Sequence, residues 1–599
     1  MRLKMLMVTL IGSLLLLAPT AVSADQSWVG DPGKAWPVPN DAERGMHVQW
    51  FMDSFPGEST SSLVDNVLEK DRYQNPTCTS AEDTRCKSNN LQYSAVLPTC
   101  KKANDLYCVE EFGIISKDGN KNKAIYTRNF PTRTQNYFSG STELKLPEAS
   151  TGSLFSLPEA THGGGDLYYV SVFAEGMLNR SSGASLDRFS MRIFPVKLQP
   201  DSAINGEDEA GWSMEKNGGS GHPIGMWRGS GYGFSGNSFC VAGSAAEKLC
   251  AQRYAFPADL KFYVKTRLQN APSGWLHGRI YNPDISLTGT SGNYSLEVSA
   301  FPVAVPIVYK MYRYPDMPQA LKDKYDVTTG DFKPVAANYS KETINSIITV
   351  GGCGRSACTD NPLTRNKIVQ PAPSDPYGMD QLPIWLPYVD DKASALLGTW
   401  SMRTLDSNEA SGASQCFTNG TSGITGIVTT NATQYLAGPP KFNSAEQTLE
   451  YKVSAPHLTS KGETFYGSYD LLMRSDVARC VYGFSNAPIK GTISVTTAEG
   501  EQKVATESVK EAKGWVSLSA NGFTYSAPTI RVKLSQDKPE PVKVEETTPV
   551  AAPAPNQEVQ KVAKSSVASK KKSITCTNGK LTKKIVGANP KCPTGFKKK

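Results

Sequence analysis

The segment Trp275-Leu276-His277-Gly278-Arg279 carries the side chains of this sequence that are best suited to binding chemistry. An indole can stack on a sugar ring, an imidazole titrates near neutral pH, and a guanidinium pairs with anions. Trp275, His277 and Arg279 therefore form a possible ligand site. The alternative is core packing, in which a tryptophan at a strand end lies in the interior beside a hydrogen-bonded histidine.

Motifs of catalysis are missing from the sequence. It has no G-x-S-x-G elbow, no H-E-x-x-H motif and no P-loop, and it has only five histidines. A glycosidase needs two carboxylates about 5–10 Å apart, and sequence spacing does not show such a pair. The acidic run Glu207-Asp208-Glu209 is typical of a solvated loop. We therefore predict no enzyme activity and no catalytic residue, and we keep a secreted carbohydrate-active hydrolase as the alternative.

The twelve cysteines form neighbouring couples, which is typical of an exported protein in an oxidising location. Sequential pairing gives the disulfides Cys78–Cys86, Cys100–Cys108, Cys240–Cys250, Cys353–Cys358, Cys416–Cys480 and Cys576–Cys592. A nested pairing of Cys78 with Cys108 and of Cys86 with Cys100 stays open, because sequence does not fix connectivity. No C-x-x-C occurs and the histidines are scattered, so we predict no metal and no cofactor.

Positive charge is concentrated at residues 570–599, which contain ten lysines and no acidic residue. These candidate polymer-binding residues are Lys570, Lys571, Lys572, Lys580, Lys583, Lys584, Lys591, Lys597, Lys598 and Lys599. Without Arg2 and Lys4 the formal charge of +8 becomes +6, so residues 25–569 carry −4 once the ten lysines are subtracted. A body of this charge argues against nucleic-acid binding. The basic tail favours an anionic polymer or surface as the partner.

The first 24 residues have the pattern of a secretory signal peptide. A basic start at Arg2 and Lys4 precedes an apolar run, and small residues end at Ala24, after which we expect cleavage. The apolar run is short for an uncleaved anchor. No later segment has the roughly 18 uninterrupted apolar residues of a membrane span. The sequence therefore predicts a secreted or cell-surface protein without an integral membrane segment after cleavage.

Strands are the elements that must position these residues. Helices are expected only at Ser61–Lys70, where Leu63, Val64, Val67 and Leu68 form an apolar stripe, and at Asp316–Lys324. Apolar or alternating patterns predict strands at 167–173, 192–198, 260–268, 275–280 and 294–301, with Pro195 suggesting an edge strand. Further strands are predicted at 448–454, 469–474, 491–497, 502–508, 515–519 and 529–534, with Asn521-Gly522 among the turns.

The predicted fold class is mainly β, with two or three disulfide-linked β-rich domains, the last an immunoglobulin-like β-sandwich tied by Cys416–Cys480. The expected parts are a signal peptide (1–24), an N-terminal domain with two cysteine pairs (25–200), a β-rich middle domain (201–390), the β-sandwich (391–536), a Pro-rich linker (537–569) and the Lys-rich tail (570–599). The glycine-rich stretch 218–236 is predicted to be a loop. An Asp–Arg network in Arg474–Cys480 is expected to brace the disulfide.

The segments S-I-T-C (573–576), G-K-L-T-K-K (579–584) and N-P-K-C-P-T-G-F-K-K-K (589–599) resemble the lysine-rich, two-cysteine C-terminus of large secreted actinobacterial proteins. Residues 438–442, 475–480 and the region up to 515 resemble the last β domain of such proteins, and residues 275–279 and the cysteine-bearing N-terminal part look like the same group. The resemblance implies a cell-envelope or secreted protein and supplies no catalytic residue. No sortase-type L-P-x-T-G ending is present.

The combined expectation is a non-enzymatic surface protein, structural or adhesive, retained by electrostatic contact between the tail and anionic wall polymers or polysaccharides. Another interpretation treats the tail as a sorting tag that is later removed. The sequence gives neither the ligand nor the oligomeric state.

Overall fold

The computed structural model describes residues 45–50, 61–65, 75–132, 136–200, 240–244, 247–290, 292–313, 318–324, 348–351, 366–369, 374, 376–405, 409–410, 415–418, 423–485, 488–496, 502–504, 506–525, 529–536, 572–578, 581–587, 591–592 and 596–598. They belong to two compact units, Met1–Lys538 and Pro539–Lys599, here called the body and the C-terminal unit. The predicted signal peptide, the glycine-rich stretch 218–236 and the Pro-rich linker lie outside the described residues.

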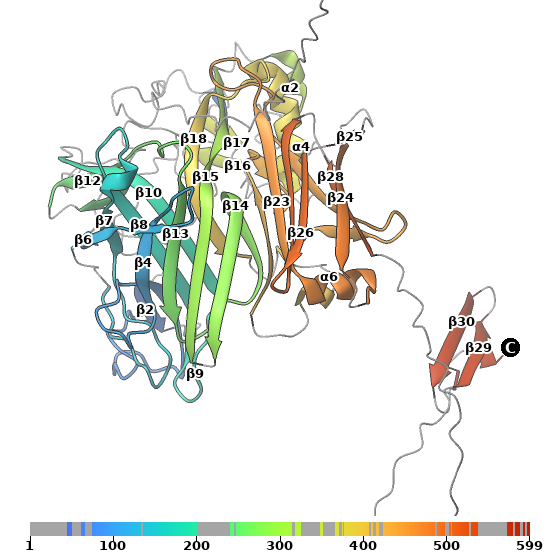
Figure 1. Ribbon diagram of the computed structural model, residues 1–599, viewed down its shortest axis with the longest axis horizontal. Helices are drawn as coiled ribbons and strands as arrows, with labels where there is room; N and C mark the ends of the chain where they lie inside the picture. Colours follow the sequence, from blue (N-terminus) through green and yellow to red (C-terminus); the bar gives the residue numbers. More distant parts are fainter. Residues whose placement is uncertain are drawn as a thin grey trace, which may run out of the picture. The chain divides into compact units, whose positions relative to one another are not determined.

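The mainly β fold class is confirmed, since strands fill the body (Figure 1). The described helices are short: α2 (Gln319–Lys324), α4 (Pro376–Trp385), α5 (Gln415–Thr418), α6 (Ser475–Tyr482) and the 3-10 helices η4 (Pro158–Ala160) and η7 (Leu386–Val389). The helix predicted at Asp316–Lys324 is confirmed by α2. Among the described helices, none is long and apolar enough to cross a membrane.

One long sheet, here called the middle sheet, runs through the body. In order of hydrogen bonding its strands are β6 (Ile125–Phe130), β7 (Gly152–Ser156), β8 (Leu167–Asn179), β10 (Arg188–Pro200), β18 (Ala395–Thr404), β14 (Gly274–Thr290), β19 (Ile424–Thr430), β23 (Tyr466–Arg474), β27 (Trp515–Thr524) and β26 (Thr506–Ala512). Three short strands extend it at β8, namely β3 (Asn90–Val96), β2 (Ser62–Asp65) and β9 (Gly183–Ala184).

Two further sheets contribute to the cores of the body. The first outer sheet contains β5 (Lys121–Lys123), β4 (Cys108–Ile115), β13 (Lys261–Leu268), β15 (Asn293–Arg313) and the second half of β14. The second outer sheet contains β20 (Gln434–Tyr435), β21 (Lys441–Asn443), β22 (Thr448–Ser454), β28 (Thr529–Gln536), β24 (Ile489–Thr496) and β25 (Gln502–Val504).

The remaining strands of the body pair at its margins: β1 (Gly45–Trp50), β16 (Ile348–Gly351) and β17 (Asn366–Val369) beyond β15, and β11 (Cys240–Ser244) and β12 (Leu249–Arg253) beyond β10.

The middle sheet is buried on both faces where β14, β19 and β23 cross it. Leu276 and Leu472 belong to the core shared with the first outer sheet. Trp275, which precedes Leu276, and Leu471, which precedes Leu472, belong to the core shared with the second outer sheet. Because successive side chains of a strand point to opposite faces, one strand contributes to two cores. This explains why β18 and β19 lack the alternation seen in the second half of β13, where the half-buried Lys265 and Arg267 alternate with the buried Thr266 and Leu268.

The helix predicted at Ser61–Lys70 is wrong where the structure describes it, because residues 62–65 form strand β2. Leu63 pairs with Tyr93 of β3, and both side chains are fully buried. The buried Ser61 hydroxyl donates to the Ser150 carbonyl at 2.8 Å and accepts from the Val96 amide at 3.0 Å. Burial therefore follows a period of two residues, and tertiary pairing overrides the short helical stripe.

Two smaller predictions are also wrong. Pro195 does not mark an edge strand, because β10 pairs with β8 on one side and with β18 on the other at 190–193. Asn521-Gly522 is not a turn but lies inside β27, where the pairing with β23 shifts between Gly467 and Ser468. Gly522 has φ +74 there, a conformation that suits a bulge glycine. The strands predicted elsewhere in the described residues are confirmed.

Strand pairs cross both positions where domain boundaries were expected, after residues 200 and 390. β4 pairs with β13, and β10 and β14 each pair with β18. The division into two units falls after Lys538, next to the expected start of the linker. The strands of residues 391–536 are shared between the middle and second outer sheets, and the immunoglobulin-like arrangement stays a prediction.

Three disulfides are confirmed: Cys78–Cys86, Cys100–Cys108 and Cys416–Cys480. The first two exclude the nested alternative. Cys592 is also disulfide-bonded. The side chains of Cys240, Cys250 and Cys576 and all of Cys353 and Cys358 lie outside what the structure describes. These bridges fit an oxidising, extracellular location.

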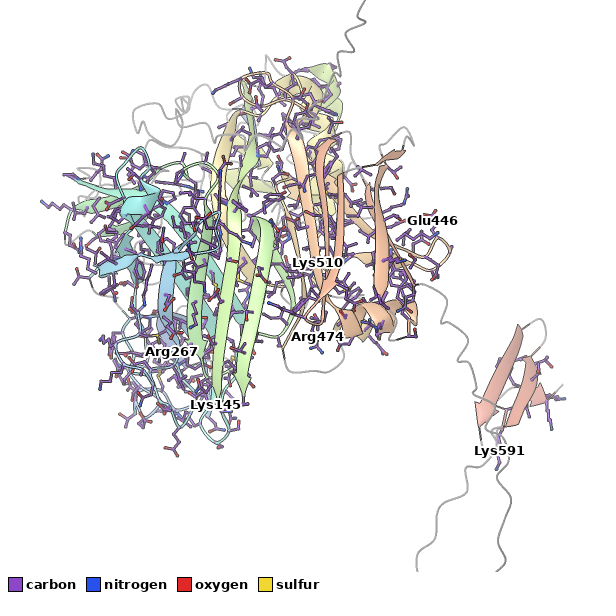
Figure 2. The ribbon with its side chains drawn as sticks, in the orientation of Figure 1. Lys145, Arg267, Glu446, Arg474, Lys510 and Lys591 are labelled. Carbon is purple, nitrogen blue, oxygen red and sulfur yellow. A yellow bond between two sulfur atoms is a disulfide. The ribbon has the colours of Figure 1, made fainter. Side chains whose placement is uncertain are left out.

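The expected Asp–Arg network surrounds the Cys416–Cys480 bridge. Arg474 Nε donates to Asp476 Oδ1 at 2.9 Å, and Arg479 pairs with Glu511 at 2.8 Å. Arg474 caps the start of α6 and Arg479 lies within this helix, next to Cys480 (Arg474 is labelled in Figure 2). The predicted role of this segment in bracing the bridge therefore has a geometric basis.

Gly426 of β19 offers a test of the two-sided burial. A Cβ atom there would lie 2.4 Å from the Trp275 ring and 2.9 Å from the Leu472 carbonyl oxygen. Gly426→Ala should therefore lower the free energy of unfolding by about 1–3 kcal/mol, measured by chemical denaturation. In a Trp275→Phe background the smaller ring should reduce that penalty. An unchanged stability of Gly426→Ala would contradict the close packing.

Candidate functional site

The structure places the predicted ligand site of β14 in the interior of the body. Trp275, His277 and Arg279 are only 4 %, 3 % and 1 % exposed. They share one face of the strand and point toward the core of the second outer sheet. The Trp275 ring packs edge-on against Phe417 at 5.0 Å between ring centroids. This placement fits the core-packing interpretation.

His277 and Arg279 are both organised around Tyr435 of β20. The His277 ring stacks on the Tyr435 ring with centroids 3.8 Å apart, and the Arg279 guanidinium lies 4.6 Å from the same centroid. Arg279 Nη1 donates to the carbonyl oxygens of Thr430, at 3.2 Å, and Ala432. The guanidinium thus satisfies backbone groups between β19 and β20, which is a structural use of a buried cation.

The C-terminal unit is a small antiparallel sheet of β29 (Lys572–Asn578), β30 (Leu581–Gly587) and β31 (Lys597–Lys598). The described lysine side chains of this unit, Lys591, Lys597 and Lys598, are all exposed, and Lys591 is labelled in Figure 2. Lys572, Lys583 and Lys584 occupy strand positions whose backbone alone is described. The other predicted tail lysines, Lys570, Lys571, Lys580 and Lys599, lie outside the described residues.

Two described carboxyl groups have pKa values raised by burial, which is the property a general acid needs. One is Glu175, whose pKa the neighbouring Arg188 partly lowers again, and the other is the buried Asp470. Asp470 Oδ2 accepts from the Asn282 amide at 2.9 Å and from Thr429 Oγ1 at 3.0 Å, and Oδ1 accepts from Ser519. Asn282 lies where the pairing of β14 with β15 shifts. Asp470 therefore stabilises β14 at the position where its pairing with β15 shifts.

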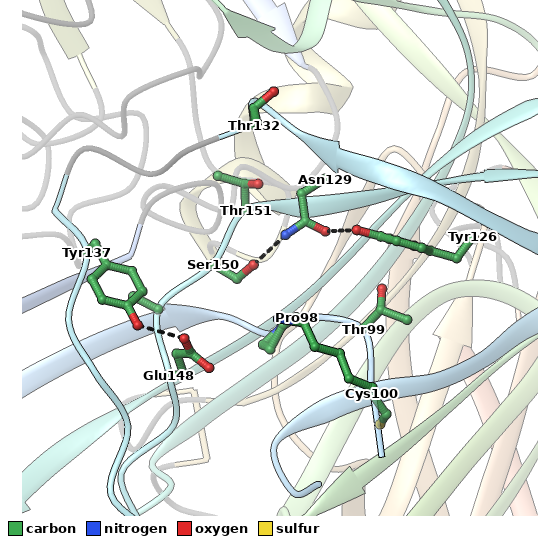
Figure 3. A pocket seen from close by; sticks show the side chains of 12 residues that line it. Pro98, Thr99, Cys100, Tyr126, Asn129, Thr132, Tyr137, Glu148, Ser150 and Thr151 are labelled. Atoms are coloured by element: carbon green, nitrogen blue, oxygen red, sulfur yellow. Dashed lines mark hydrogen bonds between the residues drawn. The ribbon is translucent and has the colours of Figure 1, made fainter. Parts of the chain in front are cut away.

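The most site-like surface feature is a cleft at the β6 end of the middle sheet (Figure 3). It encloses about 680 Å³, within the range of about 300–1,000 Å³ that is usual for small-molecule sites. Its floor is the buried segment Ala149–Thr151 before β7. Its rim contains the exposed side chains Lys101, Tyr126, Thr132, Tyr137 and Glu148.

Two tyrosines stand at opposite ends of this cleft (Figure 3). Tyr126 is 44 % exposed and Tyr137 is 48 % exposed. The described part of the chain has four large apolar or aromatic side chains with high exposure. Tyr126 and Tyr137 are two of them, and a third, Ile125, precedes Tyr126 in the sequence. Exposed aromatic rings are thus concentrated at this site, with Tyr466 elsewhere on β23.

Hydrogen bonds fix both tyrosines from within the cleft. Tyr126 donates to Asn129 Oδ1 at 2.8 Å, and Asn129 Nδ2 donates to Ser150 Oγ at 2.9 Å. Tyr137 donates to Glu148 Oε1 at 2.7 Å. This bond to a carboxylate, with some burial, raises the pKa of Tyr137 to about 12, so the phenol stays protonated at neutral pH.

The backbone below the cleft is held in place by buried polar contacts. Ser61 bonds both the amide and the carbonyl of Ser150, and Thr151 Oγ1 donates to the Pro131 carbonyl at 2.6 Å. The loop at 98–101 is tied by the Cys100–Cys108 bridge. At the far rim, Glu247 accepts from Thr132 and pairs with Arg128 at 2.6 Å. The cleft is therefore preformed.

Sequence reasoning missed this cleft. Its described lining comes from residues 98–101, from Tyr126, Asn129, Thr132 and Tyr137, and from residues 148–151, and no short motif joins them. The predicted cysteine couple Cys100–Cys108 was the nearest signal, because it marked one wall as a fixed loop.

No protein-family model, curated protein or solved structure matches this chain.

Asp470 gives a prediction on pH dependence. Its folded-state pKa lies above the ordinary value of about 3.9, so the folded state holds the proton more tightly. The free energy of unfolding should fall as pH rises from 3.9 through the folded-state pKa. Asp470→Asn lacks this titration and should gain stability relative to wild type between pH 4 and pH 7, measured by guanidinium denaturation.

Asp470→Ala is the comparison variant, because it removes the acceptor of the Asn282 amide and of the Thr429 and Ser519 hydroxyls, of which Thr429 is buried. It should be less stable than Asp470→Asn by about 1–3 kcal/mol at both pH values. A difference between Asp470→Asn and wild type that is the same at pH 4 and pH 7 would contradict the account.

Proposed function

We propose that this protein is a non-enzymatic, secreted cell-surface protein, structural or adhesive, that is retained by its basic C-terminal unit on anionic envelope polymers. The observation that carries the proposal is the exposure of Lys591, Lys597 and Lys598 on the compact C-terminal unit. The three confirmed disulfides support an extracellular setting.

The charge distribution favours contact through the C-terminal unit. Residues 570–599 carry ten lysines and no acid, whereas residues 25–569 carry a formal charge of −4. An anionic polymer is attracted to the first and weakly repelled by the second. Each exposed lysine contact is worth only about 0–1 kcal/mol and is screened by salt, so retention requires several lysines together.

The carboxylates of the body favour a non-enzymatic role over the alternative of a carbohydrate-active hydrolase. Glu148 is the one carboxylate among the described residues that line the cleft, and glycoside hydrolysis ordinarily uses two. The buried Asp470 and paired Glu175 have structural partners. The resemblance of the C-terminal segments to exported actinobacterial proteins agrees with the proposed surface location.

Deleting residues 570–599 should release the protein from the cell surface into the medium, because the body alone is acidic. In vitro, the full chain should bind polygalacturonate beads at low salt and elute as the salt concentration rises. The deletion variant should not be retained. Retention of the deletion variant equal to that of the full chain would overturn the proposal.

A matched control distinguishes binding through the C-terminal unit from an effect of the net charge of the whole chain. The triple change of Lys591, Lys597 and Lys598 to Gln should lower the salt concentration needed for elution. The same change at the exposed body lysines Lys441, Lys510 and Lys533 alters net charge equally and should have a smaller effect. Equal effects of the two triple variants would contradict binding through the C-terminal unit.

A further inference from the structure

We propose that the cleft between Tyr126 and Tyr137 is a binding site for a neutral oligosaccharide. This site lies in the body and its assignment is independent of the basic C-terminal unit. It would give a surface-retained protein a second, selective contact.

The tyrosine rings provide the apolar part of such a site. A pyranose ring presents C–H groups on its faces, and these pack well against an aromatic ring. The hydroxyls of Tyr126 and Tyr137 are tied to Asn129 and Glu148, so each ring is held in a fixed orientation while about half of the side chain stays exposed. A ring that is already ordered loses little conformational entropy on binding.

Between the rings lie groups that match sugar hydroxyls, which both donate and accept. The Asn129 amide offers an acceptor and a donor, and each atom has capacity beyond the bond it makes to Tyr126 or Ser150. Glu148 uses Oε1 for Tyr137, and a carboxylate accepts several bonds through its two oxygens. Figure 3 shows Asn129, Ser150 and Glu148 in a row between the two tyrosines.

Charge and size narrow the ligand class. The lining residues include one lysine, Lys101, and one carboxylate, Glu148, so the described lining carries no net charge. A neutral saccharide suits this balance better than a polyanion does. A cleft of about 680 Å³ with a tyrosine at each end has room for more than one sugar ring.

The test is calorimetric titration of the full chain with cellotriose, maltotriose, xylotriose and triacetylchitotriose. At least one should bind detectably at about 1 mM. Tyr126→Ala and Tyr137→Ala should each weaken that binding by about ten-fold, because each removes a stacking surface. Tyr137→Phe keeps the ring and should retain most of the affinity.

Tyr466→Ala is the matched control, because Tyr466 is as exposed as Tyr137, at 48 %, and lies outside the cleft. It should bind like wild type, and circular dichroism should confirm that every variant is folded. Deleting residues 570–599 should leave trisaccharide binding unchanged, so failure of the polymer-retention proposal would be seen separately.

Three results would overturn the assignment: no binding of any of the four trisaccharides, wild-type affinity in a Tyr126→Ala, Tyr137→Ala double variant, or equal losses in Tyr466→Ala. Binding of a polyproline peptide in place of the sugars would also overturn it and would indicate a peptide groove.

Discussion

Burial of the middle sheet on both faces is the constraint on which the body depends. Where β14, β18, β19 and β23 cross the interior, they have no solvent-facing side, so every polar group on them needs an internal partner. Asp470 accepts a hydrogen bond from the Asn282 amide of β14, and Arg279 donates to backbone carbonyls at the end of β19. Strands from residues 62 to 524 are joined in this single ladder of hydrogen bonds.

The position of residues 275–279 and of the cleft in this ladder bears on where the proposed ligand would bind. Residues 275–279 have the chemistry of a site but lie on the strand with two buried faces, and the Arg279 guanidinium is used to bond backbone carbonyls of the fold. The cleft lies at the other end of the ladder, where β8 is flanked by β7 and β3 and the sheet reaches solvent. Loops leaving a rigid sheet edge are where binding residues usually gather. The proposed binding site therefore lies at the edge of the sheet and not on the interior strand.

Much of the fold could be predicted from the sequence. Alternation identified β13, turn spacing identified the strands after residue 440, and three local or long-range cysteine pairs were correct. The helix at Ser61–Lys70 failed because pairing with β3 overrides a short periodic pattern. The three-layer arrangement depends on contacts between segments more than a hundred residues apart, such as β10 with β18, and sequence periodicity contains no information on such pairs. The cleft brings together residues between Pro98 and Thr151 that no short motif connects.

The central claim is that the body is one structure built around a shared middle sheet. Native-state hydrogen exchange, followed by mass spectrometry on peptides from β10, β14, β18 and β19, tests it most directly. The account predicts that amides of all four strands exchange slowest and with one common dependence on denaturant, because they open only in global unfolding. Two groups of strands that open at different denaturant concentrations, separated near residue 200 or residue 390, would contradict it.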